Sequence, residues 1–284
     1  MTAASAPGTA GASALAARRH SSWLCIKAIA RRHWYVLRRS PHRLFDVTIW
    51  PLVDVLLFGS IATFFASSAG GPAGQRGFGY LLAGIVLWHV VYQSQISLST
   101  GFLEEAWTRN LLNLMVTPMR EWEYVAGVVL LGMAKLVMGV GLVALVAVIA
   151  FAFDITTLGV SLVPIAAVLL LTGWVIALFV IGLVLRFGAG AEALAWGILF
   201  VALPLSGVFY PVEALPAVFR PIAVALPTTH AFAAGRSVLD GSGLDWSSLA
   251  LAGVTSVALT AAGVGWVVAM LRMFRRRGYV TRYS

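Results

Sequence analysis

Charged side chains are scarce in this sequence, and the densest group of them lies between two long apolar runs. Residues Glu104 to Tyr124 read EEAWTRNLLNLMVTPMREWEY, with four acids, two arginines and one proline. In the whole chain only 11% of residues are charged, whereas 60% are hydrophobic. This polar segment is therefore the first candidate for a functional site.

Two further charges lie inside apolar runs, where a charge is costly and usually faces a partner or a watery path. Asp54 is about two helical turns into the first run, and Lys135 about three turns into the third. The sequence predicts an intramembrane pair between Asp54 and Lys135, with a proton relay as the alternative. Glu192, near the start of the fifth run, is expected at the membrane interface.

Sequence motifs for catalysis and for nucleotide binding are missing. A phosphate-binding loop needs Gly-Lys followed by Ser or Thr, but the only two lysines follow Ile26 and Ala134. One cysteine allows no internal disulfide, and no His or Cys pair has the spacing of a metal site. His89, near Tyr92, Gln93 and Gln95, and His230 are interpreted as hydrogen-bonded packing residues. We expect no catalytic, cofactor-binding or metal-binding residue in this chain.

The elements that position these residues are predicted to be membrane helices. The mean hydropathy of +0.90 over 284 residues indicates more apolar surface than one soluble core of this size could bury. Apolar runs of about 20 residues can each cross a bilayer as a helix. The sequence predicts an all-α membrane protein with six spans, near residues 46–68, 78–101, 123–152, 159–186, 189–209 and 246–274.

The net charge of +9 is distributed as expected for a membrane protein with cytoplasmic ends rather than for a nucleic-acid-binding protein. Eight Lys and Arg residues precede the first span and five follow the last. Only Arg76, Arg220 and Arg236 lie in connections expected outside the cell. Residues 1–20 are predicted to be a disordered cytoplasmic tail rather than a signal peptide, and residues 21–284 to be one transmembrane domain.

Residues 21–43 are predicted to form an amphipathic helix in the cytoplasmic interface. Apolar side chains recur at helical spacing while basic ones occupy other faces, and a simple membrane anchor is the alternative reading. The apolar set is Trp23, Ile26, Ala30, Trp34 and Leu37, and the basic set is Lys27, Arg31, Arg38 and Arg39.

Residues 102–120 are predicted to be a cytoplasmic segment with a second helix, and this helix ends before Pro118. Leu103, Trp107, Leu111 and Met115 recur at helical spacing and would hold this helix to the bundle. A loop helix lying on lipid is the alternative, but acids facing anionic headgroups would be repelled. The residues expected to meet a protein partner are Glu104, Glu105, Thr108, Arg109, Asn110 and Asn113.

Residues 204–240 are apolar but contain five of the eleven prolines, which prevents one continuous helix. We expect broken helical pieces over 209–240 that re-enter the outer leaflet, with an ordinary extracellular loop as the alternative.

With these segments in place, the layout resembles the ABC transporter type-2 permease family, which includes nodulation-factor and daunorubicin exporters. The resemblance rests on WPLVDVLLFGS in the first span, on EEAWTRNLLNLMVTPMREWEYVAG, and on LPLSGVFYPVEALPAVFRPIAVALPTTHAFAAGR. The second stretch departs from the Gly-Thr-Leu-Glu type of sequence that many members have there. The resemblance extends over nearly the whole chain after residue 20.

The resemblance implies the membrane subunit of an exporter in a bacterial plasma membrane, with both termini cytoplasmic. Two copies would pair, each gripping a separate ATPase subunit that binds ATP and Mg²⁺, and would move a drug, glycolipid or lipid-linked glycan. It also implies a substrate path near Trp50, Trp88, Tyr92 and Gln93, although packing or an interfacial belt also explains those aromatics. The implied outer gate consists of Phe209, Tyr210, Pro211, Pro216, Pro227 and His230.

Two other classes of function stay open at this point. A lipid-modifying membrane enzyme would use His230, Arg236 and Asp240, and a proton-coupled carrier would use Asp54 and Glu192.

Overall fold

The computed structural model describes residues 21–107, 120–188, 191 and 193–277, and every element in these ranges is helical. Along the chain they are α2 (Ser22–Arg39), α3 (Pro41–Ala69), α4 (Gly71–Trp107), α6 (Glu121–Phe151), η1 (Ile155–Ser161), α7 (Leu162–Phe187), α8 (Ala193–Leu205), η3 (Val212–Ala214), α9 (Arg220–Ala225), α10 (Pro227–Leu239) and α11 (Trp246–Arg277).

Five of the described helices are long and apolar enough to cross a membrane, and they lie in α3, α4, α6, η1 with α7, and α11. The remaining predicted span, 189–209, corresponds to α8, whose 13 residues form a shorter apolar helix. Pro204 lies in its last turn and Gly207 follows with φ of 64°. Helix length therefore supports five spans directly and leaves the crossing by α8 as a proposal.

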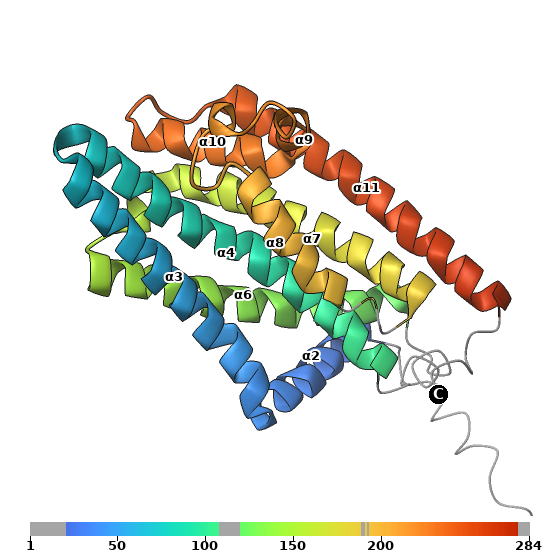
Figure 1. The fold of residues 1–284 in the computed structure, drawn as a ribbon. Coiled ribbons are helices and arrows are strands. Elements are labelled where there is room, and N and C mark those ends of the chain that lie inside the picture. The colour runs from blue at the N-terminus through green and yellow to red at the C-terminus, as the bar shows by residue number, and fades with distance from the viewer. Residues whose placement is uncertain (1–20, 108–119, 189–190, 192, 278–284) are drawn as a thin grey trace, which may run out of the picture.

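The α4 helix lies at the centre of the bundle, and α3, α6 and α7 pack around it. The α3 and α4 helices form an antiparallel pair, joined where Gly70 and Gly71 both have positive φ (Figure 1). The α7 helix in turn packs against α11. The bundle has two ends, which we name the α2 end and the α10 end after the short helices found there (Figure 1).

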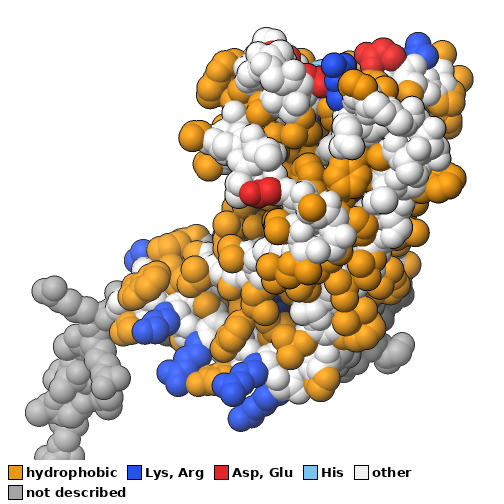
Figure 2. All heavy atoms as spheres, turned by 90° about the vertical axis from the view of Figure 1, so that its left-hand side faces the viewer, with side chains coloured by type: hydrophobic (Ala, Val, Ile, Leu, Met, Phe, Trp, Pro, Cys, Tyr) orange, Lys and Arg blue, Asp and Glu red, His pale blue; other side chains and the backbone are white. Residues whose placement is uncertain are grey.

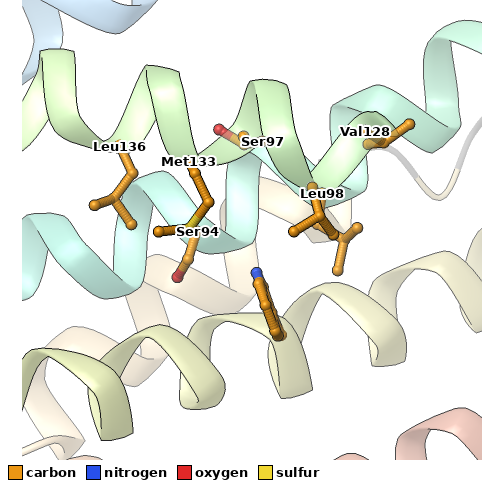
Figure 3. Close-up of a pocket in the computed structure, with 9 residues that line it drawn as sticks. Ser94, Ser97, Leu98, Val128, Met133 and Leu136 are labelled. Carbon is orange, nitrogen blue, oxygen red and sulfur yellow. The ribbon is translucent and has the colours of Figure 1, made fainter. Parts of the chain in front are cut away.

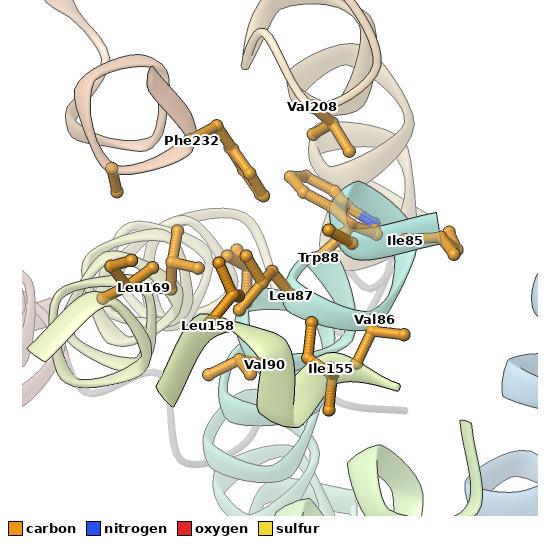
Figure 4. Close-up of a cluster of buried hydrophobic side chains, with 14 of the residues drawn as sticks. Ile85, Val86, Leu87, Trp88, Val90, Ile155, Leu158, Leu169, Val208 and Phe232 are labelled. Atoms are coloured by element: carbon orange, nitrogen blue, oxygen red, sulfur yellow. The ribbon is translucent and has the colours of Figure 1, made fainter. Parts of the chain in front are cut away.

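The largest buried cluster lies where α4 meets the short helices of the α10 end. Figure 4 shows Leu87 and Trp88 of α4 converging with Leu158 of η1, Val208, and Phe232 of α10. The segment that contains the prolines is thus packed into the core of the bundle. It is divided into η3, α9 and α10, as the spacing of its prolines predicts, whereas its depth in a bilayer remains a proposal.

Close helix contact at this junction depends on a glycine. A Cβ added at Gly84 of α4 would lie 2.5 Å from the carbonyl oxygen of Val208. Any larger residue would push the two segments apart. Gly79, one turn earlier on the same helix, has open space around its Cα.

The surface separates into a broad apolar flank and charged ends. Figure 2 shows Lys and Arg side chains gathered at the α2 end, with mostly hydrophobic side chains along the flank above them. Large apolar residues on several spans are exposed, among them Leu57, Val137 and Val257. A bilayer would cover such a surface, since soluble monomers rarely expose contiguous apolar patches of this extent.

Candidate functional site

At the α2 end, one acidic side chain joins three helices. The carboxylate of Glu104, near the end of α4, forms an ion pair with the guanidinium of Arg43 on α3. Its other oxygen lies 3.7 Å from Nδ1 of His33 on α2. Only 16% of the Glu104 side chain is exposed. We name Glu104, Arg43 and His33 the three-helix joint.

The α2 helix packs on the bundle with one face. Ile29, His33 and Leu37 are buried at a spacing of four residues, and Ile29 lies where a Cβ at Gly127 of α6 would be. Among the residues expected on its apolar face, Leu37 is buried, whereas Trp23 and Trp34 are exposed. The two indoles therefore point away from the core, as interfacial aromatic residues do.

The basic residues of α2 that the sequence assigns to the interface lie on other faces. Arg31 donates hydrogen bonds to the hydroxyl of Tyr35 from Nε at 3.0 Å and from Nη2 at 2.8 Å. Its guanidinium is 5.3 Å from the Tyr35 ring centroid. Lys27, like Arg31, is exposed. These cations remain at the surface, where lipid phosphates or a protein partner can reach them.

The α4 helix continues without a break to Trp107, so the residues 102–107 belong to it and not to a separate helix. Leu103 is buried against Val180 and Val184 of α7. The sequence between the predicted span and Trp107 contains neither proline nor glycine. The carbonyl of Gly101, the last residue of that span, accepts a hydrogen bond from the hydroxyl of Tyr124 at 3.3 Å. A span that extends into the polar segment connects any movement there directly to the centre of the bundle.

Most of the predicted partner contact lies outside the described residues. Thr108, Arg109, Asn110 and Asn113 fall there, as do Leu111, Met115 and Pro118. The described chain resumes at Arg120, whose N–H donates to Glu123 Oε2 at 3.0 Å, and Glu123 is buried at the start of α6. Glu104, which was expected to face the partner, instead binds inside the chain.

In the middle of the bundle, Asp54 of α3 lies beside His89 of α4, with 3.5 Å between Oδ2 and Nε2. His89 is fully buried, and its Nδ1 lies 2.9 Å from the carbonyl oxygen of Ile85. The predicted pairing of Asp54 with Lys135 is not found. The positive charge of Lys135 instead interacts electrostatically with Glu104. The reason is helix offset: Gly59 of α3 packs on Phe151 at the far end of α6, so Lys135 lies several turns nearer the α2 end.

The residues suggested for a substrate path occupy different environments. Trp50 is half exposed on the flank of α3, and Trp88 is buried in the core. Tyr92 lies between His89 and Trp196, with ring centroids 5.7 Å and 6.2 Å away. Gln93 is buried, and its amide lies where a Cβ at Gly139 of α6 would be. The structure therefore does not gather these four residues at one surface.

One small pocket lies between α4, α6 and α7. Ser94, Ser97 and Leu98 of α4 line it, together with Val128, Val129, Gly132, Met133 and Leu136 of α6 and Trp174 of α7 (Figure 3). Ser94 donates to the carbonyl of Val91 at 2.9 Å. The pocket is lined by both polar and apolar side chains and lies inside the bundle, where the three helices pack together.

At the α10 end, side chains hold the proline-rich segment by bonds to its backbone. Arg236 Nη1 donates to the carbonyl of Gly207 at 2.6 Å, and Tyr210 donates to that of Pro204 at 2.7 Å. The Phe209 ring stacks on Phe58 of α3 with centroids 4.3 Å apart. Pro211 precedes η3, and Pro227 is buried at the first turn of α10.

The three residues considered for an enzyme are each engaged with a different partner. His230 Nε2 lies 2.9 Å from the carbonyl of Val224, and the carboxylate of Asp240 accepts a hydrogen bond from Tyr80 on α4. Burial lowers the pKa of Arg236, while the nearby charges of Tyr80, Glu213 and Asp240 act in the opposite direction. These contacts fix the segment to α4 and to itself. Within the segment, the carbonyl of Pro216 also accepts a backbone hydrogen bond from the N–H of Phe219 at 2.9 Å.

Sequence reasoning missed His33 and Arg43 as partners of Glu104. Arg43 was counted only as a basic residue before the first span. The signal that could have found them is the acidic pair Glu104 and Glu105 just after the second span, on the same side of the membrane as a strongly basic amino-terminal segment.

Long apolar helices with charged ends define a multi-pass membrane protein. The sequence model of the ABC-2 type transporter family matches residues 25–239, most of the chain, and the chain belongs to this family. This confirms the family inferred from the sequence motifs. A search of curated proteins gave no match. The chain is thus a permease component of an ABC transporter, and members of this family generally work with an ATPase subunit.

Proposed function

We propose that this chain is the permease subunit of an ATP-driven exporter that moves a hydrophobic or amphiphilic substrate out of the cytoplasm or the inner leaflet. Two copies of the chain pair, and each binds a separate ATPase subunit that carries ATP and Mg²⁺. Membership in the ABC-2 type family supports this proposal, together with the absence of a phosphate-binding loop from the sequence.

The observation that carries the coupling mechanism is the three-helix joint. Glu104 ties α4 to α3 through Arg43 and to α2 through His33, directly before residues 108–119. A push by the ATPase on that segment or on α2 would thus reach two spans at once. Glu104 transmits the movement in this proposal, and Glu105 with the polar residues 108–113 forms the contact.

The topology proposed here has six spans, with α8 as the fifth, and both termini in the cytoplasm of a bacterial cell. The concentration of Lys and Arg at the α2 end supports this orientation. The α2 helix then lies in the cytoplasmic interface, and η3, α9 and α10 re-enter the outer leaflet. Phe209, Tyr210 and His230 close the outer end of the path.

The test is co-purification with the P-loop ATPase encoded by a neighbouring reading frame. We expect Glu105→Lys to reduce capture of that ATPase at least about tenfold, because reversing a contact charge costs more than about 1.4 kcal/mol. Glu213→Gln, at the opposite end of the bundle, is the control. Capture that is unchanged by Glu105→Lys would contradict the proposed contact.

Two other functions are separable by simple assays. Turnover of a lipid by this chain alone would indicate an enzyme, and transport that needs a proton gradient but no ATP would indicate a carrier. The engagement of His230, Arg236 and Asp240 in separate structural bonds favours the permease over the enzyme.

A further inference from the structure

The carboxylate of Asp54 lies in a membrane span, yet it is partly open to the outside of the chain. Its side chain is 35% exposed. Trp50, one turn earlier, and Leu57, about one turn later, are exposed on the same stripe of α3. An indole, a carboxylate and an alkyl side chain in one row form a surface with one negative charge in an apolar setting.

The hydrogen bond of His89 to the backbone shows that a neutral His89 would bring no positive charge to this site. A carbonyl oxygen can only accept, so Nδ1 of His89 must carry the hydrogen that reaches Ile85 O at 2.9 Å. In the neutral ring, Nε2 then presents a lone pair toward Asp54 Oδ2 at 3.5 Å. An ionised Asp54 facing that lone pair would be repelled. A proton, or another cation, is needed at this place.

The other titratable groups around the pair do not supply this charge. The α4 helix brings Tyr92 next to His89. Val143 and Ala147 of α6 share the buried cluster with Val55 and are apolar. Lys135 of α6 acts on Glu104 instead. Among the described residues, His89 is the one titratable group recorded within ion-pair distance of Asp54.

We propose that Asp54, with Trp50 beside it, binds the cationic group of an amphiphilic substrate, and that this cation competes with a proton shared by Asp54 and His89. The substrate class of the permease is then a lipophilic cation. When the site is empty, the shared proton keeps the pair close to neutral, which lowers the cost of holding Asp54 in a bilayer. When the cation arrives, the carboxylate binds it and the proton leaves to solvent.

Charge complementarity favours a cation over a second copy of the chain at this surface. In a two-fold symmetric contact over α3, the same residues from both copies approach one another. Two Asp54 carboxylates would then meet in an apolar interface, where like charges are strongly unfavourable. The indole of Trp50 suits a cation as well, because the face of an aromatic ring attracts positive charge.

The experiment measures binding of tetraphenylphosphonium to the purified full chain in nanodiscs of zwitterionic phosphatidylcholine, without ATPase. This probe carries a permanent charge, so any pH dependence comes from the protein, and triphenylphosphine oxide serves as the uncharged companion. We expect saturable binding that tightens by up to about tenfold per pH unit while the pair titrates, with release of one proton per bound cation. The uncharged companion should bind without pH dependence.

Three variants separate the role of the Asp54 carboxylate from that of the Trp50 indole in cation binding. Asp54→Asn should weaken cation binding by about tenfold or more and abolish its pH dependence. Trp50→Leu should weaken binding but keep the pH dependence, because the proton site remains. Asp154→Asn is the matched control, since Asp154 caps η1 through Thr156 N at 2.8 Å outside the spans, and it should behave as wild type.

A measurement on the wild-type chain guards against a variant that fails to fold. Dicyclohexylcarbodiimide adds to a protonated carboxyl group, and the acid proton moves to a nitrogen of the reagent. The adduct at Asp54, quantified by mass spectrometry, should decrease as pH rises and when tetraphenylphosphonium is added. Modification of Asp54 that the cation leaves unchanged would overturn the proposal.

The inference would also be overturned if Asp54→Asn bound the cation like wild type, or if that variant changed only the fraction of dimer, which would show that a second copy covers Asp54. Because it names a substrate class, the inference rests on the proposed permease function. The two can fail separately, since binding here needs no ATPase, whereas the proposed function is tested by ATPase capture.

Discussion

Glu104 on α4 forms an ion pair with Arg43 on α3, and this contact connects the ends of two membrane spans. Both residues lie directly beside the two segments proposed to meet an ATPase, which are α2 and residues 105–113. The ion pair is partly buried, with 28% of the Arg43 side chain and 16% of the Glu104 side chain exposed, so it is more enclosed than a fully solvated surface salt bridge. Movement of either segment would therefore be shared by α3 and α4.

The first prediction concerns this ion pair. Glu104→Gln and Arg43→Gln should each lower the free energy of unfolding, and the double variant should lose less than the sum of the two. We expect a coupling energy of about 1–3 kcal/mol, as for residues in one charge network. Denaturant or thermal unfolding in detergent measures all four proteins. Strictly additive losses would show that the two side chains do not depend on each other.

The second prediction concerns the contact between α4 and the segment after α8. Gly84→Ala should destabilise the protein by about 1–3 kcal/mol, because the added methyl group would clash with the carbonyl of Val208. Gly79→Ala, on the same helix, is the control and should be neutral or stabilising by up to about 1 kcal/mol. Equal melting temperatures for the two variants would disagree with the close contact at Gly84.

The third prediction concerns pH at the start of α11. Hydrogen bonds from Ser247 and Ser248 lower the pKa of Asp245 from 3.8 to about 2. A depressed carboxyl pKa gives stability that is fully present above 3.8 and is lost as pH falls toward 2. Hydrogen exchange at the first turn of α11 should therefore increase, after correction for the intrinsic rate, between these two pH values.

Asp245→Ala is the comparison for this pH effect. Without the carboxylate, the amides of Ser247 and Ser248 lose their acceptor at 3.0 Å and 3.2 Å. Their exchange should be fast already at neutral pH and should show no further transition below 3.8. A wild-type transition that persists unchanged in this variant would assign it to another group.

The fourth prediction concerns the crossing by α8. In a Cys25→Ser background, a cysteine at Ser242 should react with a membrane-impermeant maleimide in intact cells, whereas one at Arg186 should react only after permeabilisation. Both positions are exposed in the structure. The two positions lie on opposite sides only if α8 crosses the membrane. The same labelling pattern at both positions would mean five spans.

The long helices could be predicted from the sequence because apolar runs of sufficient length have few alternatives to a membrane helix. The division of residues 204–240 followed from the prolines at 211, 216, 221 and 227, since each one limits the helix that precedes it. The family also followed from motifs, because Ser-Gly before Phe209 and Pro before His230 occur in a fixed order.

Side-chain partners could not be predicted in the same way. Asp54 and Lys135 seemed level by counting residues, but the offset between α3 and α6 depends on tertiary contacts such as Gly59 with Phe151. Glu104 was assigned to a partner because helical periodicity cannot show that Arg43 folds back toward it. The run from residue 102 to Trp107 was read as a new helix, although nothing in it ends α4.

Transport by the reconstituted complex tests the central claim most directly. The chain and its ATPase are placed in liposomes, and uptake of a labelled amphiphile is followed in inside-out vesicles with ATP and Mg²⁺. We predict that uptake requires both subunits and is lost when the phosphate-binding lysine of the ATPase is replaced. Uptake that persists with this ATPase variant and stops only when a proton gradient is removed would contradict the account.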